Sequence, residues 1–179
     1  MDEPGTTVED FPDFVEADVN VVDALTDLTA FMKRESGSAD SKYIREIAEY
    51  FPAEEDQRSF SLRLIIHYLG DIHQPLHGVS EVDSRFPAGD LGGNAQKVPL
   101  DEASGVGDLH AIWDSVIYEY TGYETMPFDS EEWSYYSEQA TKLHTAHPID
   151  EAVIFPNQFA TWSKEGLDLA ISTVYEGKY

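Results

Sequence analysis

Two histidines in this chain are each followed by an aspartate four residues later: His67 by Asp71, and His110 by Asp114. On a helix, residues four apart lie one above the other, so each pair can direct an imidazole nitrogen and a carboxylate oxygen toward one point. Nitrogen and oxygen ligands of this kind suit zinc. The same spacing also fits a simple hydrogen bond within one helix. Taken without the other candidates, His67 lies between apolar neighbours, a setting that is typical of a histidine packed in the core.

His77 is a third candidate ligand. It follows Pro75, which limits the preceding predicted helix, so its side chain can turn back across the helix end. His77, His110 and Asp114 would give two nitrogens and one oxygen and leave a fourth position open, as catalytic zinc sites do. Two His–Asp pairs plus His77 favour a metal cluster over isolated hydrogen-bonded pairs. The predicted metal ligands are therefore His67, Asp71, His77, His110 and Asp114.

The elements that must position these residues are helices, because apolar residues repeat at three- and four-residue steps and no strand alternation stands out. One predicted helix runs from about Asp56 to Ile72 and carries the first His–Asp pair in its last turns. A second begins after a predicted N-cap at Asp108, runs to about Tyr120 and carries the other pair. Further helices are predicted from Val21, Ile44, Ser130 and Asn157 onward. Residues 78–107 are predicted to form a long loop that covers the site.

Composition bounds the class of protein. The 179 residues include 11 Lys plus Arg against 35 Asp plus Glu, a net charge of -24, and no basic stripe of the kind that binds phosphates. A polyanionic ligand would therefore depend on bound metal, unless the acidity only maintains solubility. With no cysteine, disulfides and thiolate zinc sites are excluded. We find no signal peptide and expect no membrane span, since no stretch approaches 18 apolar residues.

The string HYLGDIHQPLH, at residues 67–77, closely resembles the signature of the S1/P1 nuclease family of zinc-dependent single-strand nucleases. GGN at residues 92–94 and DLHAIWD at residues 108–114 continue the resemblance, the latter being similar to the family's Asn-Leu-His-x-x-Trp-Asp motif. The resemblance implies an all-α, multi-helix phospholipase C/P1 nuclease-like fold with long irregular loops. It also implies up to three zinc ions, and cleavage of single-stranded DNA and RNA with removal of 3'-phosphates from nucleotides.

The resemblance further assigns roles to individual residues. His67 would bind the first zinc of a buried pair and Asp71 would bridge that pair, which makes these two the catalytic candidates. His77, His110 and Asp114 would hold a third, more exposed zinc. Asn94 and His73 are expected to bind substrate or to support the ligands from outside, and for His73 a packing role is the alternative. Water activated between metals would attack phosphorus, so that no protein nucleophile is needed.

The chain departs from the family at its N-terminal side. The resemblance begins near Asn20, and residues 1–19 contain no histidine, whereas the family places further metal ligands in its N-terminal portion. We expect a fragment of a longer enzyme, with an acidic and flexible segment at 1–19 and an incomplete helical domain at 20–179. One zinc site would be complete on this chain, and a second chain could supply the missing ligands. Family resemblance places the protein in a secreted or lumenal compartment.

The predicted function is that of a zinc-dependent endonuclease and 3'-nucleotidase. Two alternatives fit the same residues. One is a zinc phospholipase C, a relative in fold with similar metal geometry and a lipid substrate. The other is a non-catalytic, zinc-stabilised subunit of an assembly, a role that the missing ligands make credible.

Overall fold

The computed structural model describes residues 7–15, 17–98, 107–115, 126–148 and 158–175. Within these ranges the regular elements are all helical, so the predicted all-α class is confirmed. The chain divides into two compact units: residues 1–114 together with 158–179, and residues 115–157. In the described part of the chain, no helix is long and apolar enough to cross a membrane.

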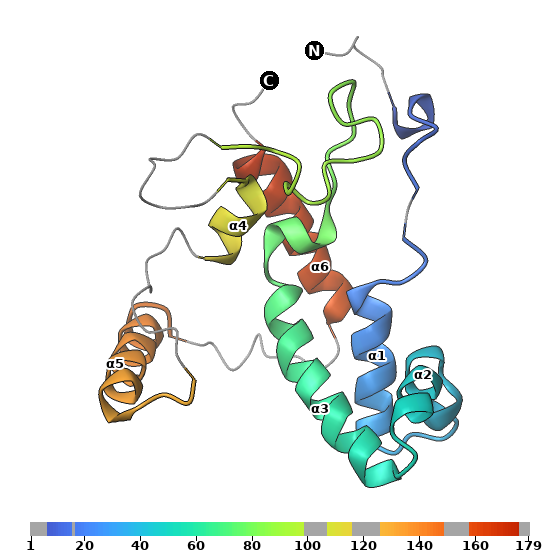
Figure 1. Ribbon diagram of the computed structural model, residues 1–179, viewed down its shortest axis with the longest axis vertical. Helices are drawn as coiled ribbons and strands as arrows, with labels where there is room; N and C mark the ends of the chain where they lie inside the picture. Colours follow the sequence, from blue (N-terminus) through green and yellow to red (C-terminus); the bar gives the residue numbers. More distant parts are fainter. Residues whose placement is uncertain (1–6, 16, 99–106, 116–125, 149–157, 176–179) are drawn as a thin grey trace. The chain divides into compact units, whose positions relative to one another are not determined.

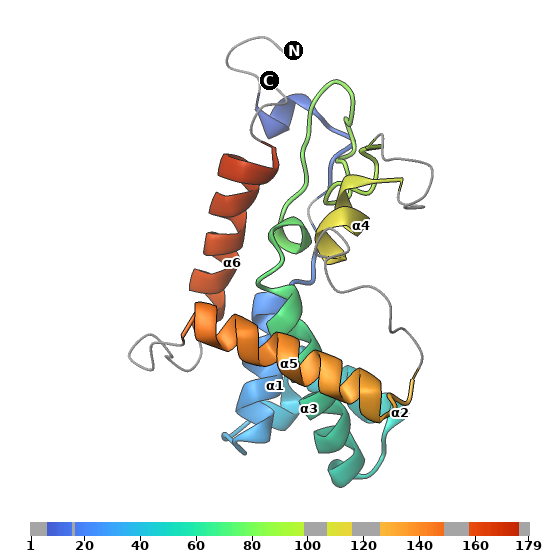
Figure 2. The same cartoon turned by 90° about the vertical axis from the view of Figure 1, so that its left-hand side faces the viewer.

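The first unit contains most of the helices (Figure 1). Its longer elements are α1 (Val21–Met32), α2 (Lys42–Tyr50), α3 (Glu54–Asp71), α4 (Leu109–Asp114) and α6 (Phe159–Leu169), the last continued by a π-helical turn, Ala170–Val174. Short 3-10 turns are η1 (Val8–Asp10), η2 (Ser38–Asp40) and η3 (Pro75–Gly78). The turn η3 lies against α6 (Figure 2).

Helix α1 is the centre of a three-helix group with α2 and α3. Asn20 caps its N-terminus, where the side-chain oxygen accepts the backbone N–H of Asp23 at 2.8 Å. Its inner face buries Leu28 and Phe31 against Ile44 and Ile47 of α2. Both sequence repeats that predicted these helices therefore correspond to buried faces, because the apolar spacing matches the 3.6-residue turn.

Helix α3 carries the first His–Asp pair in its last turn, as predicted. It begins at Glu54, two residues before the predicted start, and its first turn is acidic, which complements the positive end of the helix dipole. It ends at Asp71, one residue before the predicted end. Pro75 then opens η3, so the chain turns sharply just beyond the pair.

A second core holds the other part of the site. Leu76 of η3 packs with Ala170, Val174 and Tyr175 at the end of the C-terminal helix, and α4 adds two partly buried side chains, Leu109 and Trp113. Helix α4 has only six residues, too few to be stable alone. Its packing on this core is therefore what holds it in place.

Asp108 caps α4 as predicted: its Oδ1 accepts the backbone N–H of Ala111 at 2.9 Å. The predicted continuation of this helix to Tyr120 falls largely outside the described residues, and so does the predicted cap at Asn157. The loop prediction is consistent with residues 79–98 and 107, which form neither helix nor strand. Whether residues 1–19 and 20–179 are the natural division of the chain stays a prediction.

The second unit contains α5 (Ser130–Ala146), which begins at the predicted residue. Its N-cap is Asp129, whose side chain accepts the backbone N–H groups of Glu131 and Glu132. The side chain of Glu132 in turn accepts a hydrogen bond from the backbone N–H of Asp129 at 2.8 Å, which completes a capping box.

Arg58 of α3 provides a test of the first unit's stability. Its guanidinium donates to the carbonyls of Phe31 and Met32 at 2.9 and 2.8 Å, and so caps the C-terminal end of α1. Arg58→Met should lower the free energy of unfolding by about 2 kcal/mol, the size of a lost charge-assisted hydrogen bond. Urea unfolding followed by circular dichroism measures this change. The exposed Arg63 on the same helix is the matched control: an equal loss for Arg63→Met would contradict the capping role.

Candidate metal centre

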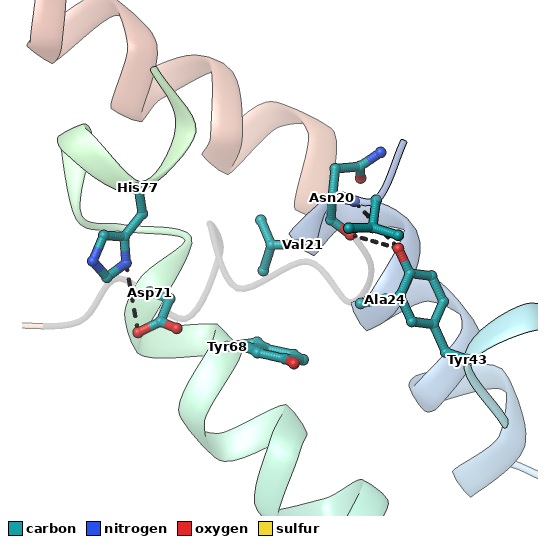
Figure 3. A pocket seen from close by; sticks show the side chains of 8 residues that line it. Asn20, Val21, Ala24, Tyr43, Tyr68, Asp71 and His77 are labelled. Carbon is teal, nitrogen blue, oxygen red and sulfur yellow. Dashed lines mark hydrogen bonds and ion pairs between the residues drawn. The ribbon is translucent and has the colours of Figure 1, made fainter. Parts of the chain in front are cut away.

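The end of α3 and the turn η3 bring three of the five predicted ligands into one neighbourhood. Nε2 of His67 lies 3.1 Å from Oδ2 of Asp71, one helical turn further on. The other oxygen of Asp71, Oδ1, lies 3.6 Å from Nδ1 of His77 (Figure 3). Asp71 therefore faces a histidine with each of its oxygens, and His67 is the more exposed of the two, with 69% of its side chain accessible against 26% for His77.

Helix α4 brings the remaining pair to the same histidine. Nε2 of His77 lies 3.2 Å from Oδ1 of Asp114, and Nε2 of His110 lies 3.3 Å from Oδ2 of Asp114. The rings of His77 and His110 stack with their centres 5.0 Å apart. One ligand atom from each of these three residues lies within 4.8 Å of the others. Small movements of these side chains would bring the three atoms to the zinc–ligand distances of about 2.0–2.2 Å.

A backbone carbonyl sets the tautomer of His110. Nδ1 of His110 lies 2.8 Å from the carbonyl oxygen of Gly92. Because a carbonyl can only accept, Nδ1 must carry a hydrogen, so in the neutral ring the lone pair is on Nε2, the atom that faces Asp114. A second hydrogen bond of this kind is the usual way in which a metal-binding histidine is oriented.

The glycine at position 92 is required by this geometry. Its backbone is left-handed, with φ of +63°. A Cβ atom there would lie 2.4 Å from the backbone oxygen of Leu76. No side chain fits at that distance without moving the backbone, so the GGN motif has a physical reason: it lets a loop carbonyl approach His110 closely.

Gln74 is a site residue that the sequence reasoning missed. Its side-chain nitrogen donates to Oδ1 of Asp114 at 2.8 Å, while its side-chain oxygen accepts the backbone N–H of Leu76. Gln74 therefore orients a carboxylate that lies 40 residues away in the chain. The available signal was its position inside the dense string between His73 and Pro75, but spacing alone does not identify a partner so distant.

His73, predicted to pack or to support the ligands, and Asn94, predicted to bind substrate or to support the ligands, have defined contacts in this structure. The ring of His73 lies 5.2 Å from that of Trp162 on α6, and its Nδ1 is 2.7 Å from the carbonyl oxygen of Leu69. Asn94 is exposed and donates its side-chain amide to the carbonyl of Leu91 at 2.8 Å. His73 thus packs against α6, and Asn94 shapes the turn that contains Gly92.

Two pockets open beside His77. The first, of about 300 Å³, is lined by two tyrosines, by Asp71 and by apolar residues of α1 (Figure 3). Its lining residues are Val19, Asn20, Val21, Ala24, Tyr43, Tyr68, Asp71 and His77. The second, of about 560 Å³, includes Phe14, His77, Gly92 and His110 in its lining. The three-residue cluster can therefore be reached by a ligand, and the space around it is largely apolar and aromatic.

Comparison with known proteins places these motifs in a family. A family model described as S1/P1 Nuclease matches residues 14–179. The chain is also similar to Endonuclease 3 of Arabidopsis thaliana, with 42% identity over 59 residues, or 33% of this chain. That match spans only 17% of the length of the plant protein. No solved structure matches the chain.

His110 tests whether the cluster binds metal. Removal of its imidazole should weaken zinc binding by at least the 10- to 100-fold that is roughly typical when a ligand's supporting partner is lost. His110→Ala should keep most of the helical signal, because the half-buried ring belongs to the site and not to the described core clusters. Zinc affinity is measured by competition with a chelator. His73→Ala is the control and should retain zinc; unchanged affinity in His110→Ala would refute the ligand assignment.

Proposed function

The chain belongs to the S1/P1 nuclease family, and from this premise we propose that it hydrolyses phosphodiester bonds of single-stranded DNA and RNA, and removes 3'-phosphates from nucleotides, in a zinc-dependent reaction. The observation that supports zinc most directly is the cluster of His77, His110 and Asp114. Two imidazole nitrogens and one carboxylate oxygen form a ligand set that zinc enzymes use, with a fourth position left for water or substrate.

Zinc bound there would act as a Lewis acid, polarising a phosphoryl oxygen and lowering the pKa of water. The chain's own residues prepare this site. Gly92 keeps Nε2 of His110 free to bind, and Gln74 orients Asp114. His77 lies between two carboxylates: its Nε2 is 3.2 Å from Asp114, and its Nδ1 faces Asp71 at 3.6 Å. Such outer hydrogen bonds fix the ligands in direction before the ion arrives.

His67 and Asp71 are proposed to act at a neighbouring pair of metals, which makes them the catalytic candidates. Asp71 is well placed to link the two parts of the site, since one oxygen faces His67 and the other faces His77. Two ligands do not complete a zinc site. We therefore propose that further ligands come from a longer chain or from a second chain, and that the protein is secreted, as its family generally is.

A non-catalytic, zinc-stabilised subunit is the second candidate function. One observation favours it. Among the residues that the structure describes, a single group is able to hold a metal ion, the cluster of His77, His110 and Asp114. One such site can stabilise a fold without performing chemistry. The two proposals differ in whether the chain hydrolyses a substrate once zinc is bound.

Hydrolysis of a fluorescent single-stranded oligonucleotide in the presence of zinc tests the proposed activity. We expect cleavage that a chelator abolishes and added zinc restores, with most of it lost in Asp114→Ala and in Asp71→Ala. Zinc counted per chain in the same samples separates the alternatives. Bound zinc without hydrolysis would refute the enzyme assignment for this chain, and cleavage of phosphatidylcholine instead would favour the phospholipase.

Salt dependence provides an independent prediction. With a net charge of -24 the protein repels a polyanion away from the site, and salt screens this repulsion, with a Debye length of about 8 Å at physiological ionic strength. The KM for a single-stranded oligonucleotide should therefore fall as potassium chloride is raised from low to physiological concentration. Basic nucleic-acid binders show the opposite sign. A 3'-nucleotide with few charges is the control and should show a smaller effect; a steep rise of KM with salt would contradict the prediction.

A further inference from the structure

Asp90 is a fully buried carboxylate, 0% exposed, that lies two residues before Gly92. Both of its oxygens accept hydrogen bonds. Oδ1 accepts the backbone N–H of Glu81 at 2.9 Å and, more weakly, the Ser80 hydroxyl at 3.3 Å. Oδ2 accepts the Tyr175 hydroxyl at 2.9 Å and the side-chain amide of Gln96 at 2.6 Å.

The burial of this side chain needs a reason. A buried polar group is costly unless it is hydrogen-bonded, and the four donors to Asp90 are neutral groups, one of which, the Gln96 amide, also donates to Glu81. Each donor must therefore be held in place for the arrangement to persist. Tyr175 is suited to this, because burial and then the hydrogen bond to Asp90 raise the pKa of its hydroxyl, which keeps its proton and remains a donor. Buried polar groups of this kind can select one local conformation over its alternatives.

The conformation selected here is that of the loop around Gly92. Backbone bonds close this loop: the N–H of Ala95 donates to the carbonyl of Asp90 at 3.0 Å, and that of Gln96 donates to Gly93 at 3.1 Å. The carbonyl of Gln96 then accepts the N–H of Leu109 at 2.9 Å, immediately before His110. Hydrogen bonds thus hold the segment that contains Gly92 at both of its ends, at Asp90 and at Gln96.

Tyr175 attaches the same loop to the core. Its ring packs with Leu76 and Val174, in the cluster on which Leu109 and Trp113 of α4 also pack. The loop that supplies the Gly92 carbonyl and the helix that supplies His110 are therefore held against one common core. The hydrogen bond from Tyr175 to Asp90 joins residues 85 positions apart, and so connects the loop to the C-terminal end of the described chain.

From this geometry we infer that Asp90 is a positioning residue of the metal site: with Tyr175 and Gln96 it holds the Gly92 carbonyl against Nδ1 of His110, and so keeps Nε2 directed at the metal. Asp90 acts through the backbone of Gly92 and touches neither metal nor substrate. The inference rests on the proposed metal site, but its first readout, the tautomer of His110, requires no metal.

Asp90→Asn and the milder Tyr175→Phe test the inference. An asparagine presents an amide donor where Tyr175 or Gln96 already donates, so the loop should lose its fixed position. Nitrogen-15 NMR of the metal-free protein, recorded at a pH at which imidazole rings are neutral, should show His110 as one tautomer in the wild type and as a mixture of tautomers in both variants. Zinc affinity, measured by chelator competition, should fall about 10- to 100-fold, as for other partners of metal ligands, while helicity is retained. Ser80→Ala, which removes only the longest of the four bonds, is the matched comparison and should change both readouts less than Tyr175→Phe does.

The outcomes separate the two proposals. A single His110 tautomer and wild-type zinc affinity in Tyr175→Phe would refute the positioning role of the Asp90 network, while the metal site would stand if His110→Ala still loses zinc. Absence of zinc binding in the wild type would refute the proposed metal site. The tautomer measurement would then decide the positioning role by itself. If Asp90→Asn fails to fold, Tyr175→Phe keeps the test decisive, because it removes one donor and leaves the ring's packing in place.

Discussion

The hydrogen bond from Nδ1 of His110 to the Gly92 carbonyl is the interaction on which the site depends. It decides which nitrogen of His110 can bind a metal, and it requires a left-handed glycine within van der Waals reach of η3. A six-residue helix cannot provide such precision by itself. The loop and the core on which α4 packs therefore have to position His110 together.

Charge imposes a second constraint. Asp71 and Asp114 face His77 from opposite nitrogens, at 3.6 and 3.2 Å. In a chain with a net charge of -24 a cation between these groups would be the largest local positive charge, and it would reverse the sign of the field that an approaching phosphate meets. A strongly acidic surface and a phosphate-cleaving site are thus compatible, provided that the ligands are oriented before the ion binds.

Behind the proposed ligands, the polar groups that support them follow one another toward the interior of the protein. Gln74 orients Asp114, Gly92 orients His110, and Asp90 holds the loop of Gly92. Each group is more buried than the one that it supports, from the half-exposed Asp114 to the fully buried Asp90. Hydrogen bonds strengthen as water is excluded, so the rigid support lies where the local dielectric is lowest and the ligands stay accessible to substrate.

The sequence by itself determined the local features of this protein. Apolar spacing predicted α1, α2 and α3, and the four-residue spacing of each His–Asp pair predicted their side-by-side geometry, because a helix repeats every 3.6 residues. Only the tertiary structure decided the long-range partners: Gln74 for Asp114, Trp162 for His73, and Tyr175 for Asp90, separated by 40, 89 and 85 residues. Spacing encodes which residues share a helix face. Which distant side chain completes a hydrogen bond depends on how the packed cores bring η3, α4 and the C-terminal helix together.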